Sequence, residues 1–176
     1  MHASLDGYVA GPNGEMDWIK YDNEMQAYVA EKLKSVNSVI YGRVTYEMMA
    51  AYWPTENDGH AKWINAAPKI VLSRTMQKAD WNNTRVIGHN IAVELRKLKQ
   101  QGTGNNDHIA IIGSAMSANY LMRLGLIDEY WIDINPVILG SGKLLFQDSG
   151  EMKKLKLVKA TAFKSGAVGF DYVVNA

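Results

Sequence analysis

The stretch IYGRVTYEMM, residues Ile40–Met49, places an apolar strand, a glycine and a helix-forming segment next to one another. A glycine at the end of a strand lets a ligand approach the backbone closely. The start of the following helix offers free N–H groups and the positive end of the helix dipole, which suits phosphate. Arg43 and Thr45 add a guanidinium and a hydroxyl donor. A plain strand-to-helix turn, with an exposed Arg43 and a capping Thr45, explains the same residues and is the stronger interpretation on spacing alone.

The same arrangement occurs in IIGSAMSANYLM, residues Ile111–Met122. Here Gly113, Ser114 and Ala115 would let a diphosphate lie against backbone amides, although small residues also simply allow tight packing. At a third strand end, LSRT (Leu72–Thr75) either provides Ser73 and Arg74 for an extra phosphate, such as the 2′-phosphate of NADPH, or is only a polar strand end. Ligands of open α/β sheets gather beyond the carboxyl ends of the strands, so two glycine turns in one sheet weigh more than one.

Short apolar runs alternate with helical stretches along the chain, which is typical of an α/β layered domain. We expect strands at residues 38–42, 69–73, 84–88, 108–113 and 129–134, and helices at Asn23–Ser35, Asn90–Gln101 and Ser117–Leu124. Leu155–Phe163 and Gly169–Val174 alternate polar and apolar residues around KSGAVG, which predicts an antiparallel hairpin. The expected fold is a mixed, mainly parallel sheet with helices on both faces, a three-layer α/β/α arrangement in a single domain over residues 1–176. The first strand is expected either to be very short or to lack its natural beginning.

The composition excludes several classes of function. Nineteen basic and eighteen acidic residues give a net charge of +1, which favours neither nucleic acid nor an anionic membrane as a partner. The absence of cysteine excludes disulfides, thiolate nucleophiles and zinc–thiolate sites, and the four histidines have no metal-type spacing, so no metal is expected. No apolar run approaches the ~20 residues of a membrane span and no leader opens the chain, so a cytoplasmic protein is expected.

Familiar phosphate and hydrolase motifs are incomplete. LGSGK, Leu139–Lys143, lacks the leading glycine and the final Ser or Thr of a phosphate-binding loop, because Val137 and Leu144 stand there. No GxGxxG follows the first strand, and no strand–GxSxG–helix elbow is present.

Three landmarks together resemble the dihydrofolate reductase-like superfamily. They are ASLDGYVAGPNGEMDW near the start, YGRVTYE after the second strand, and IIGSAMSANYLM followed by GLIDEYWIDINPVILGSGKLLF. The closest likeness is to the C-terminal reductase domain of the bifunctional riboflavin-biosynthesis deaminase/reductase, and it covers nearly the whole chain. The resemblance implies an NADPH-dependent oxidoreductase of riboflavin-biosynthesis type, with a dihydrofolate reductase-like fold that binds NADPH across the carboxyl ends of its strands. Relatives of this kind often pair, so a homodimer is expected, with EYWIDINPVILG as a candidate interface.

The resemblance also implies positions for cofactor and substrate. Ala3 would meet the nicotinamide carboxamide through its backbone, with Ala10 and Gly11 on the other side and Trp18 against the cofactor. The remaining cofactor contacts would come from the three strand ends described above: Gly42, Arg43 and Thr45; Leu72, Ser73 and Arg74; Ile112, Gly113, Ser114, Ala115 and Met116. Substrate contacts would come from Ser4, Asp17, Asp22 and Tyr46.

The stretch Ser4–Trp18 is then interpreted as a mobile flap that closes over nicotinamide and substrate and excludes water. Hydride transfer to a C=N or C=O carbon needs a proton, and Asp6, Asp17 and Asp22 are the candidate carboxyls, whose pKa burial would raise. Asp-Gly is also a common turn, so the Asp6 carboxylate has a competing structural role. We favour Asp17 or Asp22.

Two departures from the family pattern bear on the substrate. Ile111 and Ile112 stand where the riboflavin enzyme's reductase domain tends to carry an acidic residue that touches the substrate, and Asp17-Trp18 stands where folate reductases have Pro-Trp. A polar substrate group that is buried without its partner binds poorly, so such replacements discriminate strongly between substrates. A 5-amino-6-(5-phosphoribosylamino)uracil-type substrate, a dihydrofolate- or pteridine-type substrate, and a non-catalytic nucleotide-binding module therefore stay open as alternatives.

Overall fold

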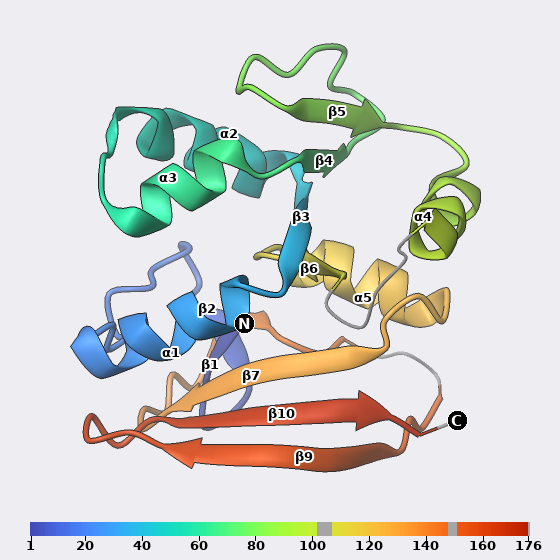
Figure 1. Cartoon of the computed structure of the whole chain (residues 1–176). Helices are drawn as coiled ribbons and strands as arrows, with labels where there is room; N and C mark the ends of the chain where they lie inside the picture. Colours follow the sequence, from blue (N-terminus) through green and yellow to red (C-terminus); the bar gives the residue numbers. More distant parts are fainter. Residues whose placement is uncertain (102–106, 148–150, 176) are drawn as a thin grey trace. The chain divides into compact units, whose positions relative to one another are not determined.

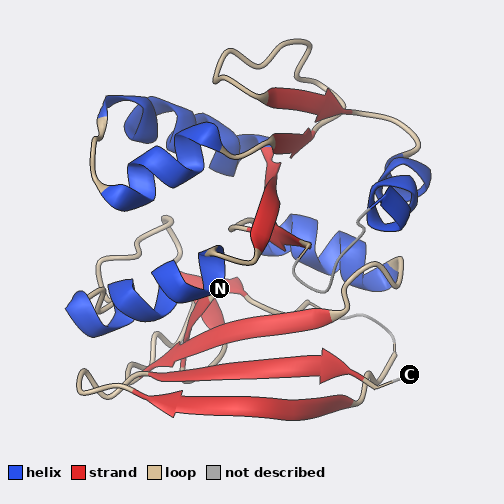
Figure 2. Ribbon diagram, in the orientation of Figure 1, coloured by secondary structure: helices blue, strands red, loops and turns tan. Residues whose placement is uncertain are grey.

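A computed structural model describes residues 1–101, 107–147 and 151–175 (Figures 1 and 2). The chain divides into two compact units. Unit 1 consists of Met1–Val29 and Asn119–Ala176, and unit 2 of Ala30–Ala118. Each unit has its own sheet, and each is described by itself below.

Unit 2 is built on a four-stranded sheet in the order β5-β4-β3-β6, with every pair parallel. The strands are β3 (Val36–Gly42), β4 (Lys69–Leu72), β5 (Thr84–Ile87) and β6 (His108–Ile111), and the helical elements are α2 (Arg43–Tyr52), η1 (Trp53–Thr55), α3 (Gly59–Ala66) and α4 (Ile91–Gln101). The two central strands are apolar along most of their length: Val39, Tyr41 and Val71 are completely buried. Such continuous apolar runs are typical of parallel strands covered on both faces.

An aromatic cluster holds α2 and the segment before β5 against this sheet. Trp81 stacks on Tyr41 at a centroid distance of 6.3 Å and lies 6.1 Å from Tyr46. The Tyr46 hydroxyl accepts a hydrogen bond from the backbone N–H of Trp81 at 2.9 Å, and the Trp81 indole N–H donates to Asn65 Oδ1 at 2.8 Å. The polar atoms of Tyr46 and Trp81 are therefore paired inside the core, whereas the buried Tyr41 hydroxyl has no hydrogen-bond partner among the described residues.

Unit 1 contains a mixed sheet in the order β1-β7-β10-β9. Its strands are β1 (His2–Ser4), β7 (Glu129–Asn135), β9 (Leu155–Ala162) and β10 (Val168–Val174), and a separate ribbon pairs β2 (Tyr8–Ala10) with β8 (Lys143–Leu144). β1 runs parallel to β7, whereas β7, β10 and β9 are antiparallel. In the β9–β10 hairpin, residues 163–167 connect two strands that pair from end to end apart from a register shift at Val158.

Helix α1 (Asn23–Leu33) contributes its first turns to unit 1. Its amino end is capped by Asp22, whose Oδ1 accepts the N–H of Met25 at 2.9 Å. Met25 is fully buried with Phe163 and Ala167, and Tyr28 packs on Phe163 edge to face at 5.0 Å. Helix α5 (Ala115–Arg123) supplies Asn119, whose side-chain amide donates to the Leu145 carbonyl and accepts from the Gln147 amide.

All the strands expected from the sequence are confirmed, with ends shifted by one or two residues, as are the three expected helices and the C-terminal hairpin. β1 has three residues. The mixed, mainly parallel pairing is confirmed, and the described strands pair in three sets. The sequence patterns missed α3, β2 and β8. α3 depends on its Asp58 cap, whose carboxylate accepts the Ala61 amide, and the two strands are too short to show a period.

Candidate functional site

The carboxyl ends of the four parallel strands form one edge of the unit 2 sheet. The register pairs Gly42 with Leu72, and Leu72 with Ile87, while Ile111 at the end of β6 pairs with Ile40. The residues that follow these strands therefore come next to one another. Three of the sequence-predicted groups, those after β3, β4 and β6, share this edge, which is the usual ligand-binding edge of such sheets.

The two glycine turns meet at this edge. A Cβ on Gly42 would lie 2.7 Å from the Ser117 Oγ and 2.9 Å from the Ser114 Oγ. A Cβ on Gly113 would lie 3.0 Å from the Thr45 Cγ2, and Gly113 and Ser114 both adopt positive φ angles, +69° and +61°. Both glycines are thus explained by the close approach of the turns. Gly113 and Ser114 lie in the turn that leads from β6 into α5.

Helices α2 and α5 both begin at this place. Gly42, the residue before α2, makes no side-chain cap, and the first turn of α2 carries no acidic residue. At α5, Ser114 Oγ accepts the Ser117 amide at 3.3 Å and the Ser117 hydroxyl at 3.2 Å. The Arg43 guanidinium is half-exposed and reaches Glu47 at 2.8 Å and 2.9 Å. An exposed pair of this kind is weak, so it leaves Arg43 available to an anion.

The groups after β4 are mainly engaged in a local turn. The Ser73 hydroxyl accepts the amides of Thr75 at 3.2 Å and Met76 at 3.0 Å. The Ser73 carbonyl lies 2.8 Å from the point where a Cβ on Gly88 would stand, so Gly88 is needed for the close approach of β4 and β5. Arg74 is exposed. Of the predicted pair, Arg74 is the better placed to meet a phosphate in solution.

In unit 1, the Asp6 carboxylate joins two sequence motifs that lie far apart in the chain. It accepts the Ser4 hydroxyl at 2.7 Å, the Leu139 amide at 3.1 Å and the Gly140 amide at 2.8 Å. We call Asp6, Ser4, Leu139 and Gly140 the Asp6 clasp. The Ser4 hydroxyl, followed by the Gly140 and Leu139 amides, lowers the pKa of Asp6 below its ordinary value. A carboxyl that is held ionised in this way is a poor proton donor, so the structural role of Asp6 prevails over the catalytic one.

The β2–β8 ribbon explains the second glycine of LGSGK, Gly142. Gly142 has φ +143°, and a Cβ there would run into the carbonyl of Ala10. Close approach of the two backbones is required because Ala10 pairs with Lys143 in the β2–β8 ribbon. The motif therefore acts in chain packing around SLDG, in agreement with its incomplete match to a phosphate-binding loop.

The loop Gly11–Trp18 is organised around Glu15. Its carboxylate accepts the backbone amide of Asn13 at 2.9 Å and the side-chain amide of Asn13 at 2.7 Å, and its carbonyl accepts the Gly11 amide at 2.9 Å and the Trp18 indole N–H at 3.1 Å. Backbone hydrogen bonding and Asn13 lower the pKa of Glu15. The loop thus holds a defined shape through its own contacts, and its closure as a flap stays a prediction.

The remaining predicted residues of unit 1 have diverse environments. Ala3 and Ser4 are completely buried on β1; the Ser4 hydroxyl also accepts the Tyr8 amide at 2.9 Å. Asp17 is exposed, and Asp22 is exposed apart from its capping bond to α1. In unit 2, Tyr46 is 4% exposed and its hydroxyl is taken by Trp81, so the structure gives it a packing role and adds no support to a role in touching substrate.

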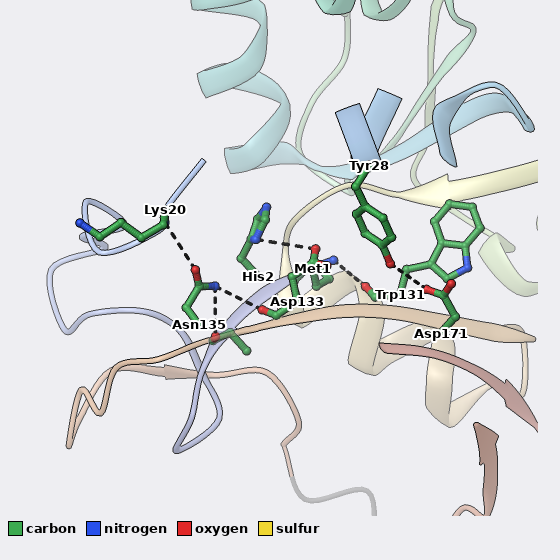
Figure 3. Close-up of polar contacts among 9 residues, drawn as sticks. Met1, His2, Lys20, Tyr28, Trp131, Asp133, Asn135 and Asp171 are labelled. Carbon is green, nitrogen blue, oxygen red and sulfur yellow. Dashed lines mark hydrogen bonds and ion pairs between the residues drawn. The ribbon is translucent and has the colours of Figure 1, made fainter. Parts of the chain in front are cut away.

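Sequence reasoning missed a polar cluster on the sheet of unit 1 (Figure 3). His2 and Asp133 are register partners, with His2 Nδ1 3.7 Å from Asp133 Oδ2. Burial lowers the pKa of His2 to about 4. The Tyr28 hydroxyl donates to Asp171 at 3.1 Å, and burial, followed by the charges of Asp171 and Asp133, raises the pKa of Tyr28. The one available signal was Asp133 in the middle of the apolar strand EYWIDIN, where a charged residue is unusual.

Gly169 leaves the space that this cluster occupies, because a Cβ there would lie 2.9 Å from the Tyr28 hydroxyl and 3.0 Å from Asp133 Oδ1. Beside it, the buried amide of Asn135 donates to the carbonyls of Ala3 at 3.4 Å and Asp133 at 3.3 Å, and its oxygen accepts the Lys20 amide at 3.4 Å.

Comparison with known proteins identifies the family. The family model of the RibD C-terminal domain matches residues 1–168. The chain is 34% identical over 177 residues to the uncharacterized protein YyaP of Bacillus subtilis, covering 98% of this chain and 91% of that protein. The chain belongs to the RibD C-terminal domain family. Its signatures SLDG and LGSG are the two halves of the Asp6 clasp.

Solved structures of low sequence identity share the fold of this RibD C-terminal domain. A putative riboflavin biosynthesis protein from Shewanella sp. PV-4 superposes with a TM-score of 0.80 at 21% identity, covering all of this chain and 97% of that one. A diaminohydroxyphosphoribosylaminopyrimidine deaminase/5-amino-6-(5-phosphoribosylamino)uracil reductase from Thermotoga maritima gives 0.68 at 16% identity, over 99% of this chain and 55% of that one. Dihydrofolate reductase from Enterococcus faecalis, complexed with NADP(H), gives 0.67 at 13% identity, covering 99% and 94%.

These likenesses confirm the predicted α/β, dihydrofolate reductase-like fold class. Within the described ranges, no helix is both long and apolar enough to cross a membrane. Among the same residues, no three His, Cys, Asp or Glu side chains gather as a metal ion would need.

Proposed function

We propose that this RibD C-terminal domain is an NADPH-dependent reductase whose unit 2 edge holds the cofactor phosphates. The observation that carries the proposal is the meeting of the Gly42 and Gly113 turns, where Cβ atoms would stand 2.7–3.0 Å from neighbouring side chains. Support also comes from the family, and from the fold shared with a dihydrofolate reductase that was solved with NADP(H).

The residues present fit a diphosphate. The amino ends of α2 and α5 adjoin, and the amides of a first helical turn have no acceptors within the helix. Each helix has at least nine residues, so each presents the positive end of a dipole. Oxygen atoms of a diphosphate would replace the missing acceptors, with Thr45 and Ser114 as hydroxyl donors and Arg43 as the cation.

The discrimination between NADPH and NADH is assigned to the end of β4. Arg74 is exposed at the neighbouring strand end, and a guanidinium binds the 2′-phosphate of NADPH through paired hydrogen bonds. When bound, the cofactor supplies a hydride from its nicotinamide. In unit 1, the predicted contacts of the nicotinamide end remain Ala3, Ala10, Gly11 and Trp18. The residues of this chain bind the cofactor and the substrate, orient them toward each other and exclude water.

The candidate proton donors are the carboxyls of Asp6, Asp17 and Asp22. Asp6 is excluded in this role because its hydrogen bonds lower its pKa. Asp22 already accepts the Met25 amide, and a protonated carboxyl would weaken this cap. Asp17 is exposed. We therefore assign the substrate-binding role to Asp17 before Asp22.

The proposed substrate is a small heterocycle with a reducible C=N or C=O bond, such as a ribosylaminopyrimidine or a reduced pteridine. The related bifunctional enzyme from T. maritima is named for the reduction of a phosphoribosylaminouracil. In this chain, Ile111 and Ile112 precede the diphosphate turn, so a substrate recognised by an acidic group at that position is disfavoured.

Cofactor titration tests the proposal. NADPH and NADH are titrated against the protein while tryptophan emission is followed, with the wild type, Gly42→Ala and Gly59→Ala compared. Gly59 is the matched control, because it also begins a helix in unit 2 and a Cβ there would meet open space. We expect Gly42→Ala to raise the Kd for NADPH about tenfold or more, which is ~1.4 kcal/mol, and Gly59→Ala to leave it unchanged.

An absence of NADPH binding by the wild type, or equal effects of the two substitutions, would refute the cofactor site. A panel of imines, pyrimidines and pteridines, scored by the loss of nicotinamide absorbance, then separates a reductase from a nucleotide-binding module without turnover.

A further inference from the structure

A groove lies between α2 and the segment that joins β4 to β5 in unit 2. Its volume is about 460 Å³, which falls within the ~300–1,000 Å³ of small-molecule sites in proteins. Six of its lining residues are apolar or aromatic: Tyr46, Ala50, Ala51, Pro54, Met76 and Trp81. None of the six is among the cofactor contacts proposed above. The groove is therefore a separate feature of this unit.

The floor of the groove is held in place by hydrogen bonds. Its two aromatic residues, Tyr46 and Trp81, are buried, and the Trp81 amide donates to the Tyr46 hydroxyl at 2.9 Å. The Trp81 indole N–H donates to Asn65 Oδ1 at 2.8 Å. On the α2 side, Ala50 and Ala51 leave the wall without long side chains. A surface that is fixed before binding loses little freedom when a ligand enters, so the groove suits the rigid apolar body of a small molecule.

The other lining residues of the groove are charged and exposed. They are two carboxylates, Glu47 and Asp80, and one ammonium, Lys78. Asp80 pairs with Lys78 at 2.7 Å, and Glu47 pairs with Arg43 at 2.8 Å. Ion pairs that water surrounds are weak and open easily. Because carboxylates outnumber ammonium groups in the lining, the groove attracts a cation.

The buried Lys69 determines which end of a ligand enters the groove. Its ammonium lies 4.4 Å from the centre of the Trp81 ring, so a second cation placed on this ring would be repelled. An apolar group meets no such repulsion there, and the thioether of Met76 packs well against aromatic rings. The charged end of a ligand therefore stays with the exposed carboxylates, while its apolar body lies toward Trp81.

We propose that this groove binds a small organic ammonium ion, with an aromatic or branched apolar body against Trp81 and Met76 and its charge beside Glu47 and Asp80. Such a ligand also acts on Arg43. Arg43 and Glu47 lie one turn apart on α2, so an ammonium ion at Glu47 competes with the guanidinium. Arg43 released from Glu47 becomes available to phosphate oxygens at the start of α2. This consequence for the cofactor rests on the proposed function, whereas the groove and the competition with Arg43 do not.

Isothermal titration calorimetry at about pH 7, without cofactor, tests the groove. The probe is phenethylamine, and the matched ligands are phenethyl alcohol, which has no charge, and hydrocinnamate, which has a negative charge.

Four variants accompany the wild type. Glu47→Gln removes a carboxylate from the groove, Ala51→Leu fills the groove, and Arg43→Gln removes the competing guanidinium. Glu94→Gln is the control, because Glu94 also forms an ion pair on a helix of unit 2, with Lys97 at 3.4 Å, and does not line the groove. All four sites are at least partly exposed, so the variants are expected to keep the thermal unfolding midpoint of the wild type.

We expect the wild type to bind phenethylamine with a Kd on the order of 1 mM or tighter, and more tightly than either matched ligand. Glu47→Gln should raise this Kd about threefold, Ala51→Leu should abolish saturable binding, and Glu94→Gln should change nothing. Arg43→Gln should lower the Kd about twofold, because the ligand no longer competes for Glu47.

A wild type without saturable phenethylamine binding overturns the proposal, and so does an equal Kd for the wild type and Ala51→Leu. Tighter binding of hydrocinnamate would assign the groove to anions through Lys78 and overturn it as well. An unchanged Kd in Arg43→Gln refutes the competition. NADPH titrated with and without saturating phenethylamine then measures the consequence: the filled groove should lower the Kd for NADPH, and an unchanged Kd refutes that link. A failure of NADPH to bind at all counts against the proposed function and leaves the result for the groove as measured.

Discussion

Lys69 offers a quantitative test of how unit 2 is held together. Its side chain is 1% exposed, and its ammonium donates to the carbonyls of Asn65 at 3.2 Å, Ala67 at 2.8 Å and Asn82 at 3.2 Å, while lying 4.4 Å from the centre of the Trp81 ring. Burial lowers its pKa from 10.5 to about 8. The ammonium thus joins α3, β4 and the turn before β5, at the cost of removing a charge from water.

The free energy of unfolding depends on pH because the folded and unfolded states bind different numbers of protons at Lys69. Below pH ~8 the lysine is protonated in both states, so it adds no slope. Between ~8 and ~10.5 the unfolded chain keeps the proton and the folded protein loses it, so the free energy of unfolding rises with pH. At ~1.4 kcal/mol for each unit of pKa, the full rise is about 3 kcal/mol, of which about 2 kcal/mol falls between pH 7.5 and 9.5.

Urea unfolding of the wild type and Lys69→Met at pH 7.5, 8.5 and 9.5 measures this rise. The methionine keeps the apolar stem and has no proton to lose. Tyr28, Tyr41 and Tyr130, whose pKa values are raised by burial, oppose the rise at higher pH, but both proteins contain them. We expect the stability difference, wild type minus variant, to increase by about 2 kcal/mol across the range. A difference that stays constant would show that Lys69 keeps an ordinary pKa, and the argument from its burial would fail.

Three further predictions concern the clasp and the core. Asp6→Asn should lower the thermal midpoint at pH 7 and make the midpoint fall less steeply in acid. The lowered pKa of Asp6 adds stability to the wild type that is present above pH ~4 and is lost as the pH falls through the pKa of the folded protein. Thermal midpoints that fall in parallel from pH 7 to pH 2 in both proteins would contradict this. Gly142→Ala should cost about 2 kcal/mol or more, since the new Cβ meets the Ala10 carbonyl at φ +143°, and chemical unfolding beside Ser141→Ala as control measures it. Tyr46→Phe should cost about 1–2 kcal/mol, because the buried Trp81 amide loses its acceptor; an unchanged urea midpoint would disprove that role.

The elements of the fold were predictable where the pattern is local. Apolar runs such as KIVL and the alternation around KSGAVG identify strands from a few neighbouring residues, and glycines at strand ends identify the turns of the unit 2 edge. Such patterns are predictive because the burial of one face of an element fixes the polarity of each residue on that face. These local patterns do not show which strands pair with each other. The pairing of β1 with β7, which lies 130 residues further along the chain, therefore could not be predicted from them.

The candidate site divides in the same way. The proximity of Gly42 and Gly113 followed from a general rule about parallel strands, and it is confirmed by the distances between their turns. The partner of Asp6 could not be foreseen, because its amide donors lie 133 and 134 residues away and carry no side-chain signature. The hydroxyls of Tyr46 and Ser73 accept hydrogen bonds from backbone amides. The sequence could not predict this, because the residue type does not say whether its hydroxyl is already hydrogen-bonded.

The discontinuity of unit 1 has a consequence for biosynthesis. Residues 30–118 leave the ribosome as one uninterrupted segment and contain every strand of their own sheet. The opening residues must wait for β7 and the LGSG segment, and until then SLDG has no amides to bind and β1 has no neighbour. The nascent chain therefore completes its middle before its beginning, and a chain truncated before β7 would leave β1 and SLDG without their partners, exposed to proteases and chaperones.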